Sequence, residues 1–147
     1  MASKPSFRDR AFVVRTYDFG EADRVVVLLT RDHGLVRAVA KGVRKTKSRF
    51  GSRVQPFVDI DVQLYPGRNL ATITQVDTVA YYGRGIIDDF DRYASACAVM
   101  EAAEKLSYAD EADEFLFNEV GSAFKALQDT DSSTPVSYTH LTLPTKA

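Results

Sequence analysis

The sequence predicts an α+β protein in which a five-stranded antiparallel β-barrel is followed by a small α-helical unit. Between residues 10 and 79, five short runs rich in β-branched and aromatic residues are separated by turn signals. After Tyr82, the spacing of apolar residues changes from the period of two typical of strands to the period of about 3.6 typical of helices. We therefore expect a barrel domain at residues 1–80 and a partial helical domain at residues 81–130.

The first three predicted strands follow one another closely. Residues 10–17 are rich in valine and aromatic side chains, and residues 24–30 form an almost wholly apolar run, as expected of a strand covered on both faces. A tight turn leads to residues 35–41, where alternation places Arg37 and Lys41 on one face and small or apolar residues on the other.

The fourth predicted strand, residues 57–65, has the clearest alternation in the chain. Its core-facing residues are Val58, Ile60, Val62 and Leu64, and its polar face holds Asp59, Asp61 and Gln63. A Pro-Gly turn precedes the fifth, residues 70–79. Residues 47–54 could form one or two helical turns before Pro56 ends them. Five strands with a helical insertion between the third and fourth describe an OB-fold, although other small barrels have similar element orders.

Two amphipathic helices are predicted after the barrel. Phe90, Tyr93, Cys97 and Met100 share one helix face, and Leu116, Val120, Phe124 and Leu127 repeat the pattern in a second helix. The acidic side chains of Asp88, Asp89 and Asp91 suit the positive end of the first helix dipole.

The end of the chain differs in composition. Residues 131–147 are rich in Ser, Thr and Pro and have no periodic apolar face, which predicts a disordered tail. The segment resembles translated adapter or vector sequence, so we expect it to be non-native and the natural protein to continue differently beyond about Thr130.

Composition limits the classes of protein. A single cysteine, Cys97, excludes an internal disulfide and a cysteine-based zinc site built from this chain alone. The polar start lacks the apolar core of a signal peptide, and no apolar run approaches the roughly 20 residues that cross a bilayer. We expect a cytoplasmic protein with no membrane partner.

Charge is distributed very unevenly along the chain. Residues 1–58 hold 13 Lys and Arg against 5 Asp and Glu, whereas residues 59–147 hold 6 against 15. Residues 37–53 alone carry seven cations and no acidic residue. Such a cluster favours a polyanion partner, because each phosphate contact releases a bound counterion. The alternative is a solvated basic loop that has no partner.

The candidate site combines this basic segment with strand-borne cations and two aromatic residues. Phe50 and Tyr65 could stack on unpaired bases, or they could simply pack in the core. The candidate nucleic-acid-binding residues are Arg15, Arg24, Arg37, Lys41, Arg44, Lys45, Lys47, Arg49, Phe50, Arg53 and Tyr65.

Catalytic candidates are few. His33 falls in a predicted turn, and no serine or cysteine has a triad-like histidine beside it in sequence. Asp59 and Asp61 could bind a metal, but they fit the polar face of an amphipathic strand better. Gly83 and Gly85 alone are too weak a phosphate-binding signal. We expect no enzymatic activity and no cofactor.

Several motifs together resemble the amino-terminal half of the RecO family. The pieces GEADR, TRDHGL, AKGVRK, KSRFG and QPF occur in the family's order, within a resemblance over about residues 8–128. The resemblance implies an OB-fold followed by a helical domain and a non-enzymatic mediator of DNA repair and recombination. It also implies binding to single- and double-stranded DNA, strand annealing, partnership with RecR and single-strand-binding protein, and assistance in loading RecA.

The chain departs from the family pattern in one respect. Many members carry a four-cysteine zinc site in the carboxy-terminal half, and Cys97 cannot supply it, so we expect that module to be absent here. Two other functions stay open from the residues alone. One is an RNA-binding OB module, and the other is a protein-interaction adaptor that uses the acidic helical half.

Overall fold

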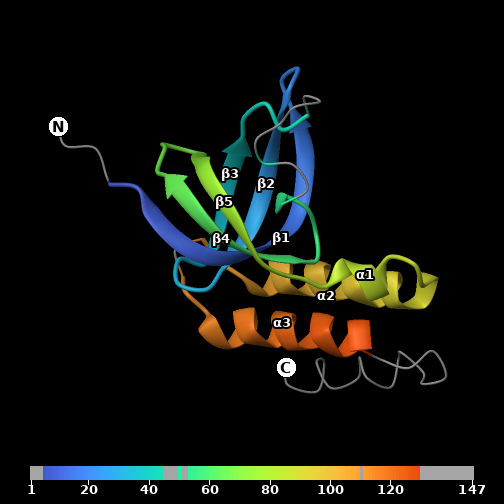
Figure 1. The fold of residues 1–147 in the computed structure, drawn as a ribbon. Helices are drawn as coiled ribbons and strands as arrows, with labels where there is room; N and C mark the ends of the chain where they lie inside the picture. The colour runs from blue at the N-terminus through green and yellow to red at the C-terminus, as the bar shows by residue number, and fades with distance from the viewer. Residues whose placement is uncertain (1–4, 45–49, 51–52, 110, 130–147) are drawn as a thin grey trace.

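The protein is described by a computed structural model in which residues 5–44, 50, 53–109 and 111–129 are placed. Five strands close into a barrel, and two long helices lie side by side along one side of it (Figure 1). This confirms the predicted α+β fold with an OB-like barrel. The elements are β1 (Phe7–Phe19), β2 (Asp23–Thr30), β3 (Leu35–Ala40), β4 (Val58–Tyr65), β5 (Ala71–Tyr81), α1 (Gly83–Ile86), α2 (Phe90–Leu106) and α3 (Glu114–Asp129). Of the expected helical turns at residues 47–54, residues 47–49 and 51–52 lie outside the described residues, as does the expected tail at 131–147.

The barrel is mixed rather than wholly antiparallel, which corrects the sequence-based expectation. Its strand order is β1-β2-β3-β5-β4, and β3 pairs with β5 in parallel through Ala38 with Ala71 and Val39 with Thr72. The reason is geometric. Directions cannot alternate all the way round a closed ring with an odd number of strands, so at least one neighbouring pair must be parallel.

The barrel interior is filled by the alternating apolar residues of the strands. The predicted inward set of β4 is confirmed, because Val58, Ile60, Val62 and Leu64 are all buried in the barrel core. β1 is longer than predicted, since its first half pairs with β4 and its second half with β2. An irregularity between Val13 and Arg15 shifts the register and brings Arg15 opposite Val27.

A second core lies between the outside of the barrel and the helices. Phe12, Val14, Val27 and Leu29 of the barrel wall pack there against α2 and α3. In α3 the predicted apolar face is confirmed for Val120, Phe124 and Leu127, whereas Leu116 is only partly buried and Phe117 is buried in addition. The barrel and the helical unit therefore share a core.

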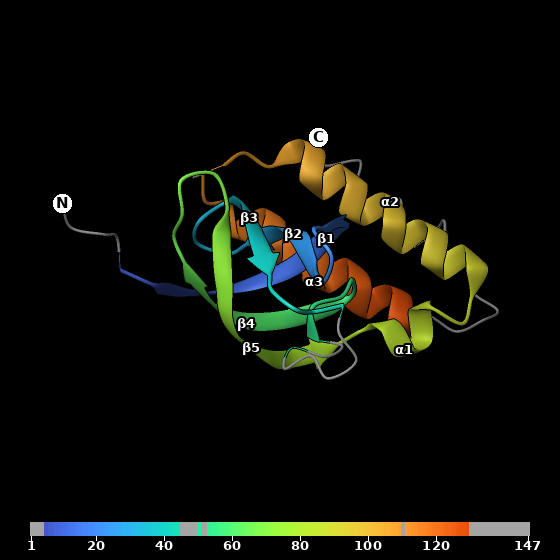
Figure 2. The same cartoon turned by 90° about the horizontal axis from the view of Figure 1, so that it is seen from above.

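The buried face of α2 differs from the predicted one. Ala96, Val99, Met100 and Ala103 are buried, whereas Phe90 is 82% exposed and Tyr93 is 45% exposed. The amino-terminal end of α2 reaches past the strands, so its large side chains have little of the barrel to cover (Figure 2). Asp89 caps this end, because its side chain accepts hydrogen bonds from the backbone N–H groups of Asp91 and Arg92.

The connection between α2 and α3 docks on the β2–β3 turn. The N–H of Leu35 donates to the carbonyl of Tyr108 at 3.0 Å, and Gly34 forms an isolated bridge with Ala109. The buried carboxylate of Asp9 holds the same turn from the other side. It accepts the N–H of Asp32 at 3.0 Å and lies 2.6 Å from Nδ1 of His33, the residue that the sequence placed in this turn.

Candidate nucleic-acid interface

Two of the predicted arginines lie on the outer wall of the barrel. Val27 on β2 pairs with Arg15 on β1 and with Arg37 on β3. Their neighbours Val26 and Leu28 point into the core, so Val27 and both arginines project outward. Val27 is covered and both arginines are exposed. The register therefore places one arginine on each side of a buried apolar residue.

An outward row of side chains runs round the barrel through all five strands. Tyr65 on β4 is opposite Thr72 on β5, Thr72 is opposite Val39 on β3, and Val39 is opposite Val25 on β2, which pairs with Tyr17 on β1. Tyr65 and Tyr17 are 47% and 40% exposed. The predicted aromatic Tyr65 and the unpredicted Tyr17 therefore stand at opposite ends of one row. Tyr17 follows Arg15 at the two-residue spacing of one strand face, a signal that could have identified it.

Three exposed cations near this row have no ion-pair partner among the residues that the structure describes: Arg37, Lys41 and Arg68. Lys41 directly follows β3. Arg68 lies in the turn before Ala71, whose pairing partner Ala38 is next to Arg37. The sequence reasoning missed Arg68 because only pairing between β3 and β5 brings its turn to the basic wall. We refer to Arg15, Tyr17, Arg37, Lys41, Tyr65 and Arg68 as the basic face.

Other predicted cations contact carboxylates of the chain itself. Arg15 lies 3.1 Å from Glu104 of α2, and Asp18 lies 3.4 Å from Arg24 and 3.5 Å from Arg44. These pairs are partly exposed, and such pairs contribute only about 0–1 kcal/mol each, so a phosphate can replace either carboxylate. Charge neutralisation within the chain therefore weakens, but does not remove, the predicted role of these arginines.

Arg24 is not on the outer wall. It lies opposite Ala40 and two residues before Val26, and both of those side chains point into the barrel core. Arg24 therefore sits at the mouth of the barrel, beside Asp18 and away from Arg15 and Arg37. The alternation of β2 requires this separation, because Arg24 and Val27 are three residues apart on one strand.

The predicted stacking role of Phe50 is not supported by its position. Phe50 is only 3% exposed and belongs to the barrel core, so its ring packs against apolar residues instead of offering a face to a base. Arg53 is exposed. Lys45, Lys47 and Arg49, the middle of the basic segment, lie outside the described residues.

The wall formed by β1, β4 and β5 contains paired charges. Arg8 contacts Asp61 and Asp77 at 3.3 Å each, and Arg10 makes a bidentate pair with Asp59, with Nε 2.9 Å from Oδ1. Asp59 was expected on an open polar face, but its side chain is only 6% exposed. It is covered because α3 packs over this part of the wall. The hydrogen bond with Asp59 raises the pKa of Arg10 above its ordinary value.

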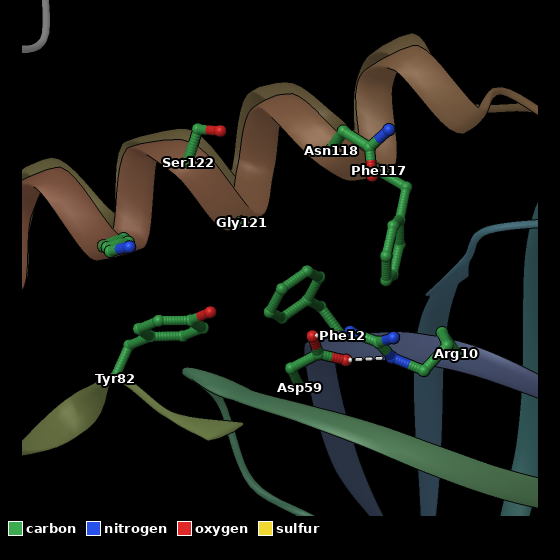
Figure 3. A pocket seen from close by; sticks show the side chains of 9 residues that line it. Arg10, Phe12, Asp59, Tyr82, Phe117, Asn118, Gly121 and Ser122 are labelled. Atoms are coloured by element: carbon green, nitrogen blue, oxygen red, sulfur yellow. Dashed lines mark hydrogen bonds and ion pairs between the residues drawn. The ribbon is translucent and has the colours of Figure 1, made fainter. Parts of the chain in front are cut away.

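A pocket of about 330 Å³ opens beside this buried pair, between the barrel and α3 (Figure 3). It mixes aromatic rings with the paired charges and a few polar side chains. Its lining residues are Arg10, Phe12, Asp59, Tyr82, Phe117, Asn118, Gly121, Ser122 and Lys125. Arg10 also lies 5.9 Å from the centre of the Phe117 ring, so its guanidinium is already engaged on two sides.

The position of Tyr82 in this pocket leads us to expect that its ionisation lowers the stability of the fold at alkaline pH. Burial raises the pKa of its hydroxyl above the ordinary value of 10.0. Its contribution to the free energy of unfolding is therefore complete below pH 10.0 and is lost as pH rises through the raised pKa. Urea unfolding of Tyr82→Phe between pH 9 and 11 should show a shallower loss of stability than the unchanged protein. Equal slopes would mean that Tyr82 ionises as easily in the folded chain as in the unfolded one.

The described part of the chain was compared with the requirements of a metal site and of a membrane-spanning helix. Within it, no three His, Cys, Asp or Glu side chains are grouped so that they could share a metal ion. Asp59 and Asp61, the carboxylates with metal-ligand potential in the sequence, each face an arginine instead. No helix among the placed residues is both long and apolar enough to span a bilayer.

The chain matches a known protein family over its barrel. The family described as "Recombination protein O N terminal" matches residues 1–82, which is more than half of the 147 residues. The match begins before β1 and ends at Tyr82, immediately after β5, so it includes every strand of the barrel and all residues of the basic face. This match establishes that the chain belongs to the RecO family of DNA repair and recombination proteins.

Proposed function

We propose that the chain is a DNA-binding recombination mediator whose basic face holds single-stranded DNA. The observation that carries this proposal is the pairing of β1, β2, β3 and β5 in a RecO-family barrel. It places Arg15 and Arg37 on one wall and brings the turn of Arg68 beside them, and neither Arg37 nor Arg68 has an ion-pair partner among the placed residues. In this role the protein would also bind double-stranded DNA, anneal complementary strands and, with RecR, assist RecA loading on DNA coated by single-strand-binding protein. The function is non-enzymatic, cytoplasmic and independent of a cofactor.

The chemistry of the basic face suits an unpaired strand. Arg37, Lys41 and Arg68 can each take a phosphate without first breaking an ion pair to a described residue. Exposed Tyr17 and Tyr65 can stack on bases, and each stacked base contributes roughly 1–3 kcal/mol. Neither contact reads a base edge, so the expected binding is tolerant of sequence.

Removing two of the unpaired cations should weaken DNA binding strongly. On a single strand each phosphate contact contributes about 0.7 to the slope of log K against log salt, or about fivefold in affinity at 0.1 M salt. The double variant R37Q/K41Q should therefore bind an oligothymidine about 25-fold more weakly and lower the slope by about 1.4. Fluorescence anisotropy titrations at several salt concentrations measure both quantities.

The matched control is Arg8→Gln. Arg8 is an exposed arginine of β1, but it lies on the other wall and is paired with Asp61 and Asp77. R8Q should change the affinity for oligothymidine much less than R37Q or K41Q alone. Equal losses from R8Q and R37Q would show that net charge, not the basic face, determines binding. RNA of matched length serves as the competitor, and a strong preference for it would favour the RNA-binding alternative.

A further inference from the structure

Arg15 is the one member of the basic face that contacts a carboxylate of the helical unit, among the residues placed in the structure. Its Nε lies 3.2 Å and its terminal nitrogen 3.1 Å from the same oxygen, Oε2 of Glu104. The side chain of Glu104 is 25% exposed and that of Arg15 is 48% exposed. The pair is thus open to solvent on the arginine side, where a strand on the basic face would pass.

Glu104 is held in place by its own helix. Its neighbour Ala103 is 2% exposed in the core between the barrel and the helices, which ties the last turns of α2 to the barrel. Lys105, the adjacent cation, is 3.0 Å from Glu101 instead. On the other side, the Arg15 guanidinium lies 5.6 Å from the centre of the Tyr17 ring, so it is oriented toward the exposed aromatic of the basic face.

We propose that Glu104 competes with DNA phosphate for Arg15 and so limits how tightly the basic face holds DNA. This inference rests on the proposed function. A phosphate oxygen that binds the edge of Arg15 formed by Nε and this terminal nitrogen must occupy the position that Glu104 Oε2 fills. Because the pair is partly exposed, DNA can displace the carboxylate.

The exchange also connects the two units of the protein. DNA binding at Arg15 breaks a contact between β1 and α2, so anything that stabilises the Arg15–Glu104 pair weakens DNA binding. By linkage, DNA weakens the hold of the barrel on the end of α2 to the same extent. A partner that draws Glu104 away from Arg15 would raise DNA affinity without touching the DNA itself.

Removing the competing charge should strengthen binding. Glu104→Gln should raise affinity for an oligothymidine about three- to fivefold at 0.1 M salt, because a phosphate no longer has to displace a carboxylate from Arg15. The control is Glu101→Gln, which removes the same charge from the same helix but faces Lys105, not Arg15. Thermal unfolding of both variants checks that the fold is kept.

A double-mutant cycle with Arg15→Gln separates direct competition from a general change in charge. Glu104→Gln should lose its effect in the Arg15→Gln background. The inference is overturned if Glu104→Gln and Glu101→Gln change affinity equally, or if the gain persists without Arg15. If every variant, including the unchanged protein, fails to bind oligothymidine even at low salt, it is the proposed function that fails.

Discussion

Gly34→Ala is expected to destabilise the fold by about 3 kcal/mol. Gly34 has φ of 73°, a left-handed conformation that costs a residue with Cβ about 1 kcal/mol. An added Cβ would also lie 2.5 Å from the carbonyl oxygen of Tyr108 and 2.7 Å from the N–H nitrogen of Glu111. These are backbone atoms and cannot rotate away, so the connection between α2 and α3 must leave the β2–β3 turn. Urea unfolding measures the loss.

Gly20→Ala is the matched control for that substitution. Gly20 has nearly the same conformation, with φ of 64°, but its added Cβ would meet nothing within 4 Å. It should therefore show only the conformational cost of about 1 kcal/mol. Similar losses at Gly20 and Gly34 would mean that the docking of the α2–α3 connection contributes nothing to stability.

Arg10→Met is expected to destabilise the protein by about 2–3 kcal/mol. The substitution keeps much of the apolar stem but leaves the Asp59 carboxylate, only 6% exposed, without its guanidinium partner. Removing one member of a fully buried ion pair costs about 3–5 kcal/mol. We expect about 2–3 kcal/mol, at or below the bottom of this range, because Arg10 is 32% exposed and water can partly replace it. Urea unfolding at neutral pH gives the change in the free energy of unfolding.

Two further variants test whether the buried carboxylate is the cause. Adding Asp59→Asn to Arg10→Met removes the unpaired charge and should recover much of the lost stability. Arg8→Met removes an exposed arginine from the same strand, and its pairs with Asp61 and Asp77 should be worth less than about 1 kcal/mol in total. A loss at Arg8 as large as that at Arg10 would contradict the special role given to Asp59.

Residue patterns along the chain were sufficient to predict the strands and the barrel. The alternation of residues 57–65 identifies β4 and its core face, because a period of two places all the apolar side chains on one side of the strand. It did not predict that α3 would also cover Asp59 on the other side. The buried face of α3 could be predicted in the same way, since Val120, Phe124 and Leu127 are large apolar residues at helical spacing. For α2 the same reasoning chose Phe90 and Tyr93, because the alanines that lie against the barrel carry a weak hydrophobic signal.

Local sequence alone determined that this chain makes an OB-like barrel with helices, is strongly basic in its first part and resembles RecO. Only the tertiary structure decided which cations act together. The irregularity at Val14 and the pairing of β3 with β5 bring Arg15, Arg37 and the turn of Arg68 to one wall, whereas alternation moves Arg24 to the barrel mouth. Packing likewise takes Phe50 into the core and places Glu104 against Arg15. Charge is a property of each residue, but its neighbours depend on strand register and helix docking, which join segments far apart in the chain.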